Sequence, residues 1–106
     1  MDERLKAILA LLRRQFETLY GERLVRLVLF GSQARGDAEL DSDIDILVVL
    51  RGPVNPGDEI TYTGDFTASL SLQYDVVISC VFVSDERFRD EQSPLLLNVL
   101  KEGVPI

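Results

Sequence analysis

Histidine and tryptophan are absent from this chain of 106 residues, and cysteine and methionine each occur once. Without histidine there is no imidazole to act as a general base, which excludes Ser-His-Asp and Cys-His nucleophilic sites and any zinc site that needs a histidine ligand. Cys80 cannot form an intrachain disulfide, which favours a reducing compartment, so we expect a cytoplasmic protein. Any catalysis must therefore depend on carboxylates, metal ions and backbone dipoles.

Long apolar runs and an excess of basic residues are also missing. No apolar run approaches the roughly 20 residues that a transmembrane helix requires, and residues 1–20 carry too many charges for a signal peptide. The 18 acidic residues against 11 basic ones give a net charge of −7, which argues against direct nucleic-acid binding and allows a basic protein partner. With 46% apolar residues the composition is that of a packed protein, and we expect a single domain over residues 1–106.

Hydrophobic periodicity and turn residues predict alternating helices and strands. Helices are expected over residues 2–20, 32–36, 58–73 and 93–102, and strands over residues 24–30, 43–50 and 76–83. Within 58–73 the apolar pattern is loose, and threonines and a glycine lower the helix propensity. The last apolar residues, Val104 and Ile106, either pack within the chain or meet a partner. Strands separated by helical connections give a mixed β-sheet with helices packed against it, an α/β (α+β) fold.

The pattern with the most chemical content joins a turn to two carboxylates. Gly31-Ser32 directly follows the first predicted strand, and Ser32 is placed to cap the short helix after it. Asp43 and Asp45 open the second predicted strand. Side chains two residues apart in a strand point to the same side, so these carboxylates project together. Paired carboxylates beside a turn with free backbone N–H groups describe a site for a divalent metal and a nucleoside triphosphate.

The glycines match neither of two known phosphate-binding motifs. Gly31 and Gly36 have the spacing of a Walker A loop, but Asp37-Ala38 stands where that loop has Lys-Ser or Lys-Thr, so we reject it. The G-x-G-x-x-G dinucleotide fingerprint is absent as well. Taken alone, the Gly-Ser pair would be a plain connection between a strand and a helix.

The acidic run matches a calcium-binding loop only at its opening. Residues 41–45 match the opening D-x-D-x-D of an EF-hand, but Ile46 replaces the required glycine and Gly52 replaces the closing glutamate. A solvated acidic turn is the simpler interpretation of Asp37, Glu39 and Asp41. It does not suit the two later aspartates, because charge beside an apolar strand is costly without a compensating cation.

The combined segments resemble a known family. G-S-x-A-R-G followed by S-D-I-D-I-L-V-V is similar to the signature of the nucleotidyltransferase superfamily related to DNA polymerase beta, and especially to that of the minimal MNT-type nucleotidyltransferases. The amphipathic first helix, a later strand with a carboxylate and the closing L-L-x-x-V-L-K-E-G-V extend the resemblance over essentially the whole chain. The resemblance implies a polymerase-beta-like nucleotidyltransferase core.

It also implies a metal site. In that family three carboxylates hold two Mg²⁺ ions, and Asp43 and Asp45 match the first two by position. Asp75, at the head of the third predicted strand, is the expected third ligand, and Asp85 after that strand is the weaker competitor.

The nucleotide site follows from the same resemblance. Gly31 and Ser32 are expected to bind the phosphates of ATP through backbone N–H and hydroxyl donors. Arg35 is expected to contact the leaving pyrophosphate, with a surface or structural salt bridge as the alternative.

The implied function is Mg²⁺-dependent transfer of AMP from ATP to a hydroxyl group. The minimal proteins resemble the antitoxin of a two-gene system whose partner is a HEPN-domain ribonuclease toxin, and members of the family can adenylylate a tyrosine of that partner. We expect the same activity here. The alternatives are a non-catalytic antitoxin that neutralises its partner by occlusion, and a small-molecule or RNA nucleotidyltransferase that acts with a separate subunit.

Overall fold

A mixed sheet with helices on both faces forms the molecule, which the computed structural model describes over residues 2–36, 42–91 and 93–106. The helices are α1 (Glu3–Tyr20), α2 (Gly31–Arg35), α3 (Pro56–Tyr74), α4 (Asp85–Asp90) and α5 (Pro94–Glu102), with a short 3₁₀ turn η1 (Gly21–Arg23). The strands are β1 (Leu24–Phe30), β2 (Ile44–Leu50), β3 (Ile78–Ser84) and β4 (Val104–Pro105). They form a four-stranded sheet in the order β3-β2-β1-β4, in which only β2 and β3 run parallel. The predicted mixed sheet with packed helices is confirmed.

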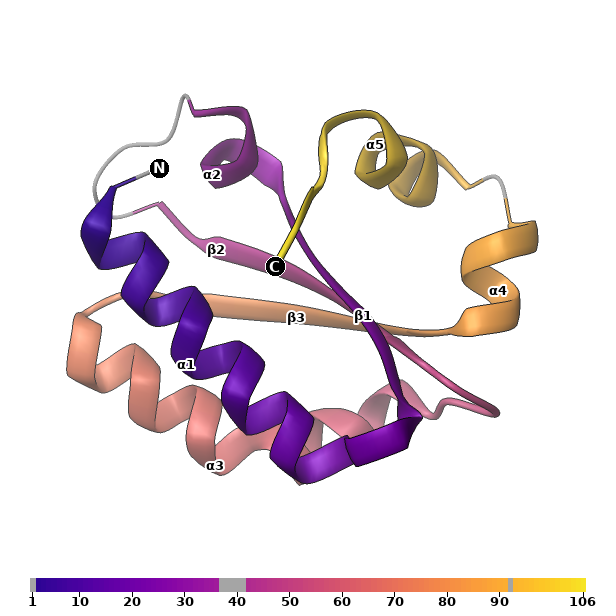
Figure 1. Ribbon diagram of the computed structural model, residues 1–106, viewed down its shortest axis with the longest axis horizontal. Helices are drawn as coiled ribbons and strands as arrows, with labels where there is room; N and C mark the ends of the chain where they lie inside the picture. The colour runs from indigo at the N-terminus through magenta and orange to yellow at the C-terminus, as the bar shows by residue number, and fades with distance from the viewer. Residues whose placement is uncertain (1, 37–41, 92) are drawn as a thin grey trace.

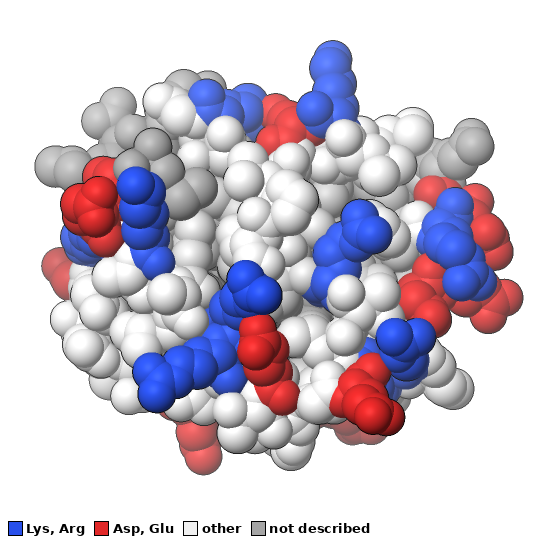
Figure 2. Space-filling view, in the orientation of Figure 1, with Lys and Arg blue, Asp and Glu red and all other residues white. Residues whose placement is uncertain are grey.

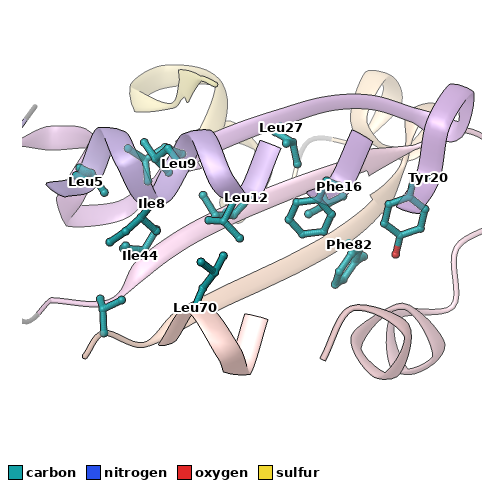
Figure 3. Packing of buried hydrophobic residues seen from close by; sticks show 14 of the residues in the cluster. Leu5, Ile8, Leu9, Leu12, Phe16, Tyr20, Leu27, Ile44, Leu70 and Phe82 are labelled. Carbon is teal, nitrogen blue, oxygen red and sulfur yellow. The ribbon is translucent and has the colours of Figure 1, made fainter. Parts of the chain in front are cut away.

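Helix α1 covers one face of the sheet because its apolar residues recur along one side. Asp2 caps the helix by accepting a hydrogen bond from the Leu5 N–H at 2.7 Å, and Gly21 ends it with φ +54°. The buried stripe consists of Leu5, Ile8, Leu9, Leu12, Phe16 and Tyr20. These side chains point from α1 onto the strands, where they meet Leu70 of α3 and Phe82 of β3 (Figure 3).

The two faces of the sheet carry separate cores. The larger core joins α1 and α3 to the even-numbered residues of β2, beginning with Ile44 and Ile46. The smaller core joins α5 and α4 to the odd-numbered residues Leu47 and Val49. Figure 1 shows α1 and α3 on one side of the strands and α2, α4 and α5 along the other. By the alternation of a strand, residues 43 and 45 belong to the side of α5.

Helix α3 forms as predicted despite its threonines. Asn55 caps it, and Pro56 occupies the first turn, where its missing N–H costs nothing. The hydroxyls of Thr61, Thr63 and Thr67 donate to the carbonyls four residues earlier, at 2.9–3.1 Å. Each threonine therefore satisfies its own polar group within the helix.

The third strand begins later than predicted. Asp75 adopts φ +51° and ψ +56° and ends α3, and the N–H of Val76 donates to the carbonyl of Ser71 at 3.1 Å. The chain still belongs to the helix terminus at these residues, so β3 starts only at Ile78. The predicted start at Val76 is therefore wrong by two residues, and Asp75 lies outside the sheet.

Besides η1, two short elements were not predicted. Residues 85–90 form α4, which Ser84 caps by accepting from the Arg87 N–H at 3.1 Å. At the other end, Val104 pairs with Leu29 of β1, and the N–H of Ile106 donates to the carbonyl of Leu27 at 3.1 Å. The last residues thus pack within the chain, as one of the two alternatives foresaw. In the part of the chain that the structure describes, no helix is long and apolar enough to span a bilayer.

Phe16 is the packing centre of the larger core, and Phe16→Ala should destabilise the protein severely. Its side chain is 0% exposed, and its ring lies 5.1 Å from that of Phe66 and 6.4 Å from that of Phe82. We expect a loss of about 3–5 kcal/mol in the free energy of unfolding, measured by urea denaturation. Leu72→Ala is the control: Leu72 is 85% exposed, so the change should stay within about 0.5 kcal/mol. Equal losses in the two variants would contradict this packing.

Candidate functional site

Strand pairing brings the Gly-Ser turn and the second aspartate together. β1 and β2 are antiparallel, and Phe30, the last residue of β1, pairs with Asp45 near the start of β2. The next residue, Gly31, therefore lies directly beside the Asp45 carboxylate. Gly31 adopts φ +75°, and a β-carbon at this position would overlap Oδ2 of Asp45. Both the backbone conformation and the close approach require glycine here.

The two aspartates are presented on the open part of the α5 side. Ile44 between them is 1% exposed and points into the larger core. Its N–H donates to the carbonyl of Val77 at 2.9 Å, which fixes the start of β2 against the segment that leads into β3. Asp43 is exposed and Asp45 is half-buried. The strand thus aims Asp45 away from the larger core, and Asp43, directly before the strand, is exposed to solvent.

The electrostatics of the pair suit a cation. Burial raises the pKa of Asp45 above its ordinary value, and the charge of Asp43 raises it further, whereas the charge of Arg35 lowers it. Two carboxylates that repel each other gain when a cation lies between them. Mg²⁺ in nucleotide enzymes is commonly held by one or two carboxylates together with substrate phosphates. The donor set of Asp43 and Asp45 therefore fits a divalent metal ion.

Ser32 is available to a ligand, although not as the predicted helix cap. Helix α2 begins at Gly31, and Phe30 is the N-cap residue without a side-chain hydrogen bond. The helix starts at Gly31, which has a positive φ, one residue before the predicted start at residue 32. Ser32 therefore lies in the first turn of the helix and not at its cap. Within the described residues, the half-buried Ser32 hydroxyl makes no hydrogen bond.

Arg35 takes part in a salt bridge and also lies near the site. Its Nη1 is 3.5 Å from Oε1 of Glu102 at the end of α5. Its charge nevertheless acts on the pKa of Asp45, so it is near the carboxylates. Glu102 is not among the predicted site residues, and its one signal in the sequence is its place in the closing segment of the family resemblance.

Gln33 is a second residue that the sequence did not reveal. Its Nε2 donates to the carbonyl of Ser42 at 3.1 Å, which ties α2 to the residue before Asp43. No local pattern distinguishes this glutamine from a solvent-facing one. Asp37, Glu39 and Asp41, which entered the alternative interpretations, lie outside the described residues.

The candidates for a third carboxylate are not gathered with the first two. Tyr74, just before Asp75, accepts a hydrogen bond at its carbonyl from Arg4 of α1, and α1 lies on the opposite face of the sheet. Asp85 follows the end of β3, whereas Asp45 lies near the start of the parallel strand β2. Among the residues that the structure describes, no three carboxylate or thiol side chains are placed to hold one metal ion.

A hollow of about 420 Å³ lies at the other end of β2 and β3, far from the carboxylates. It is lined by residues 52–54, 56 and 82–87. Asp85, the weaker candidate for a third ligand, lines it, whereas the Gly31 turn, Asp43 and Asp45 do not. We place the chemistry at Asp43 and Asp45, because chemically suited groups converge there and not in the hollow.

The raised pKa of Asp45 predicts a gain in stability when its charge is removed. When a carboxyl has a higher pKa in the folded than in the unfolded state, its ionisation destabilises the folded protein. This destabilisation is absent below the unfolded pKa of about 4 and grows as the pH rises through the folded pKa. Because solvent screens this half-exposed group, Asp45→Asn should raise the Tm by only about 2 °C at pH 7, and by nothing near pH 3. Asp65→Asn, at an exposed position of α3, is the control in the thermal scans. A lower Tm for Asp45→Asn at pH 7 would contradict the assigned repulsion.

The sequence matches a family of known activity. Residues 9–104 match the model of the nucleotidyltransferase domain. MJ0604 of Methanocaldococcus jannaschii, named as a protein adenylyltransferase, is 41% identical over 86 residues, which make up 79% of each chain. MJ1305 of the same organism, named in the same way, is 30% identical over 103 residues, or 94% of this chain and 70% of the relative.

Solved structures share the fold. One described as a minimal nucleotidyltransferase has 28% identity and a TM-score of 0.57, with 97% of this chain and 89% of that chain covered. A chain of a toxin–antitoxin complex with AMP-PNP has 23% identity and a TM-score of 0.63, with coverage of 98% and 72%. A chain of the complex between a tri-AMPylated HEPN toxin of Shewanella oneidensis and its MNT antitoxin has 20% identity and a TM-score of 0.56, with coverage of 96% and 67%. The expected minimal nucleotidyltransferase fold is thereby confirmed.

Proposed function

The chain belongs to the nucleotidyltransferase domain family, and from this premise we propose that it transfers AMP from ATP to a hydroxyl group of a partner protein. The observation that carries the proposal is the contact between the Gly31 turn and the Asp45 carboxylate, beside Asp43. This arrangement combines donors for phosphate with ligands for a divalent cation. The reaction uses ATP, so we place the protein in the cytoplasm.

The turn and α2 would hold the triphosphate. The backbone N–H groups of Gly31 and Ser32 and the free Ser32 hydroxyl would donate to the β- and γ-phosphates. Arg35 is close enough to influence Asp45 and would bind the leaving pyrophosphate. These contacts orient the α-phosphate toward the acceptor.

Asp43 and Asp45 would hold Mg²⁺ together with those phosphates. When bound, the ion stabilises the negative charge that develops on the phosphoryl oxygens. The acceptor oxygen forms a bond to the α-phosphorus, the bond from that phosphorus to the bridging oxygen breaks, and pyrophosphate leaves with the electron pair. The acceptor's proton is released to solvent.

A protein is the acceptor that the site suits best. The carboxylates are exposed or half-buried at the edge of the molecule, so a side chain of another protein can reach them. The relatives named as protein adenylyltransferases favour the same class of acceptor. We propose a tyrosine of a HEPN-type ribonuclease toxin, which the fold shared with the MNT antitoxin complex supports.

The charge distribution is compatible with a protein partner. The net charge of −7 favours a basic surface on that partner. On the face shown in Figure 2, basic and acidic side chains are interspersed among uncharged ones. A mixed face of this kind resembles a protein-binding surface more than a phosphate-backbone groove.

The direct test is the mass of the partner after reaction. The purified protein is incubated with ATP, Mg²⁺ and the product of its neighbouring gene, and intact masses are measured. We expect the mass of one or more AMP units on the partner, and none on a partner whose tyrosines are replaced by phenylalanine. Neutralisation of the partner without added mass would reject AMP transfer and favour the alternative antitoxin that acts by occlusion. AMP on RNA or on a small molecule instead would favour the other alternative.

Arg35→Ala should weaken nucleotide binding. Loss of a charge-assisted contact to phosphate costs about 1.5 kcal/mol, or roughly a tenfold rise in the Kd for AMP-PNP, measured by calorimetry with Mg²⁺. Arg87→Ala is the matched control, because Arg87 is paired with Glu91 on the distant α4. An unchanged Kd for Arg35→Ala would give Arg35 a structural role, such as its salt bridge with Glu102, and no role in nucleotide binding.

A further inference from the structure

The register of the two parallel strands identifies the β3 residue that is next to the carboxylates. Asp45 of β2 pairs with Ser79 of β3, and further along Leu47 pairs with Val81. Adjacent strands lie about 4.8 Å apart, so paired residues of parallel strands are direct neighbours. Ser79 is therefore the side chain of β3 nearest to Asp45 in the sheet.

Ser79 also points to the same side as Asp45. Leu47 belongs to the smaller core with α5, and Val81 packs against that core. Asp45 lies two residues before Leu47, and Ser79 lies two residues before Val81. Side chains two residues apart in a strand share a face, so Asp45 and Ser79 both face the side of α5. Ser79 is half-buried, and in the described part of the chain its hydroxyl makes no hydrogen bond.

The position next to Asp45 is thus occupied by a neutral group, and Asp75 does not replace it. Asp75 ends α3 three residues before β3 begins, and its neighbour Tyr74 is tied to Arg4 of α1. A hydroxyl is a weaker ligand for Mg²⁺ than a carboxylate and brings no charge. At this point the described residues therefore supply two negative charges and not three.

We propose that Ser79 is the residue that β3 contributes to the site, and that the protein binds one divalent cation, not two, with each nucleotide. This inference rests on the proposed function. Two carboxylates together with substrate phosphates are the usual ligand set of one Mg²⁺ ion. A second ion beside it would need a further carboxylate, which the described residues do not place there.

A single substitution should create the missing ligand. In Ser79→Asp, a third carboxylate would stand beside Asp45 in the register already present. Without metal, three like charges should lower the Tm relative to the natural protein. With metal and nucleotide, the same three groups should bind a second ion.

The test counts bound Mn²⁺ by the loss of its free electron paramagnetic resonance signal. AMP-PNP is kept below the protein concentration, so that ions are counted per bound nucleotide. We expect one ion for the natural protein, for Asp75→Asn and for Ser79→Ala, and two for Ser79→Asp. Ser69→Asp adds the same charge at an exposed position of α3 and should leave the count at one.

The outcomes separate this inference from the proposed function. Two ions in the natural protein, falling to one in Asp75→Asn, would overturn the inference and assign the third ligand to Asp75. A count that stays at one in a folded Ser79→Asp variant would also overturn it, because Ser79 would not face the metal. Failure to bind either nucleotide or metal would reject the proposed function as well. If Ser79→Asp does not fold, the counts for the natural protein and Asp75→Asn still decide.

Discussion

Asp45→Asn should abolish AMP transfer while the chain remains folded. Asparagine has the shape of aspartate but no charge, so it removes a metal ligand with little effect on packing. Loss of about 4 kcal/mol of transition-state stabilisation lowers the rate roughly 1,000-fold, and metal-ion catalysis commonly supplies several kcal/mol. Among the described residues, the Asp45 carboxylate is the group that lies against Gly31, so the substitution removes the metal ligand at that point.

Asp43→Asn should have an effect of the same order, because the two carboxylates act as one ligand set. The measurement is the transfer of radiolabelled AMP to the partner, with circular dichroism to verify folding. Asp65→Asn on α3 should retain full activity. A fall of less than tenfold in both site variants would show that the pair is not the metal site.

Gly31→Ala should be nearly as damaging, for a geometric reason. Alanine is strained at the φ of +75° found here, which costs about 1–3 kcal/mol of stability. Its β-carbon would also overlap Oδ2 of Asp45, so the carboxylate must move. A displacement of about 1 Å at a reacting group can cost a factor of 100, and we expect transfer to fall by at least that much.

Gly36→Ala separates the two causes. Gly36 has a similar φ of +80°, but no atom of the described residues lies within 4 Å of a β-carbon placed there. The two variants should lose comparable stability in urea denaturation, whereas only Gly31→Ala should lose AMP transfer. Similar activity in both variants would mean that the contact between Gly31 and Asp45 has no catalytic importance.

Local signals were sufficient for most of the fold and for the proximity of Asp43 and Asp45. The apolar stripe of α1, with Asp2 and Gly21 at its ends, is a local feature, and the structure has it where the sequence predicts it. The same holds for α5 after Ser93-Pro94. The period of two predicts that Asp45 of β2 and Asp43, directly before the strand, lie close together, and the charge of Asp43 does raise the pKa of Asp45.

The remainder of the site depends on pairings that no local pattern specifies. The start of β3 depends on Asp75 adopting a left-handed conformation that aspartate tolerates but does not require. The register that sets Ser79 beside Asp45 is a property of two strands with α3 between them. The salt bridge from Arg35 to Glu102 likewise joins the first half of the chain to its end.

The central claim is that the Gly31 turn, Asp43 and Asp45 form one site for a metal-bound nucleotide. A crystal structure of the protein with AMP-PNP and Mg²⁺ tests it most directly. We predict the triphosphate at the backbone of Gly31 and Ser32, and a metal ion with carboxylate oxygens of Asp43 and Asp45 among its ligands. A nucleotide bound elsewhere, for example in the hollow at the other end of β2 and β3, would contradict the claim.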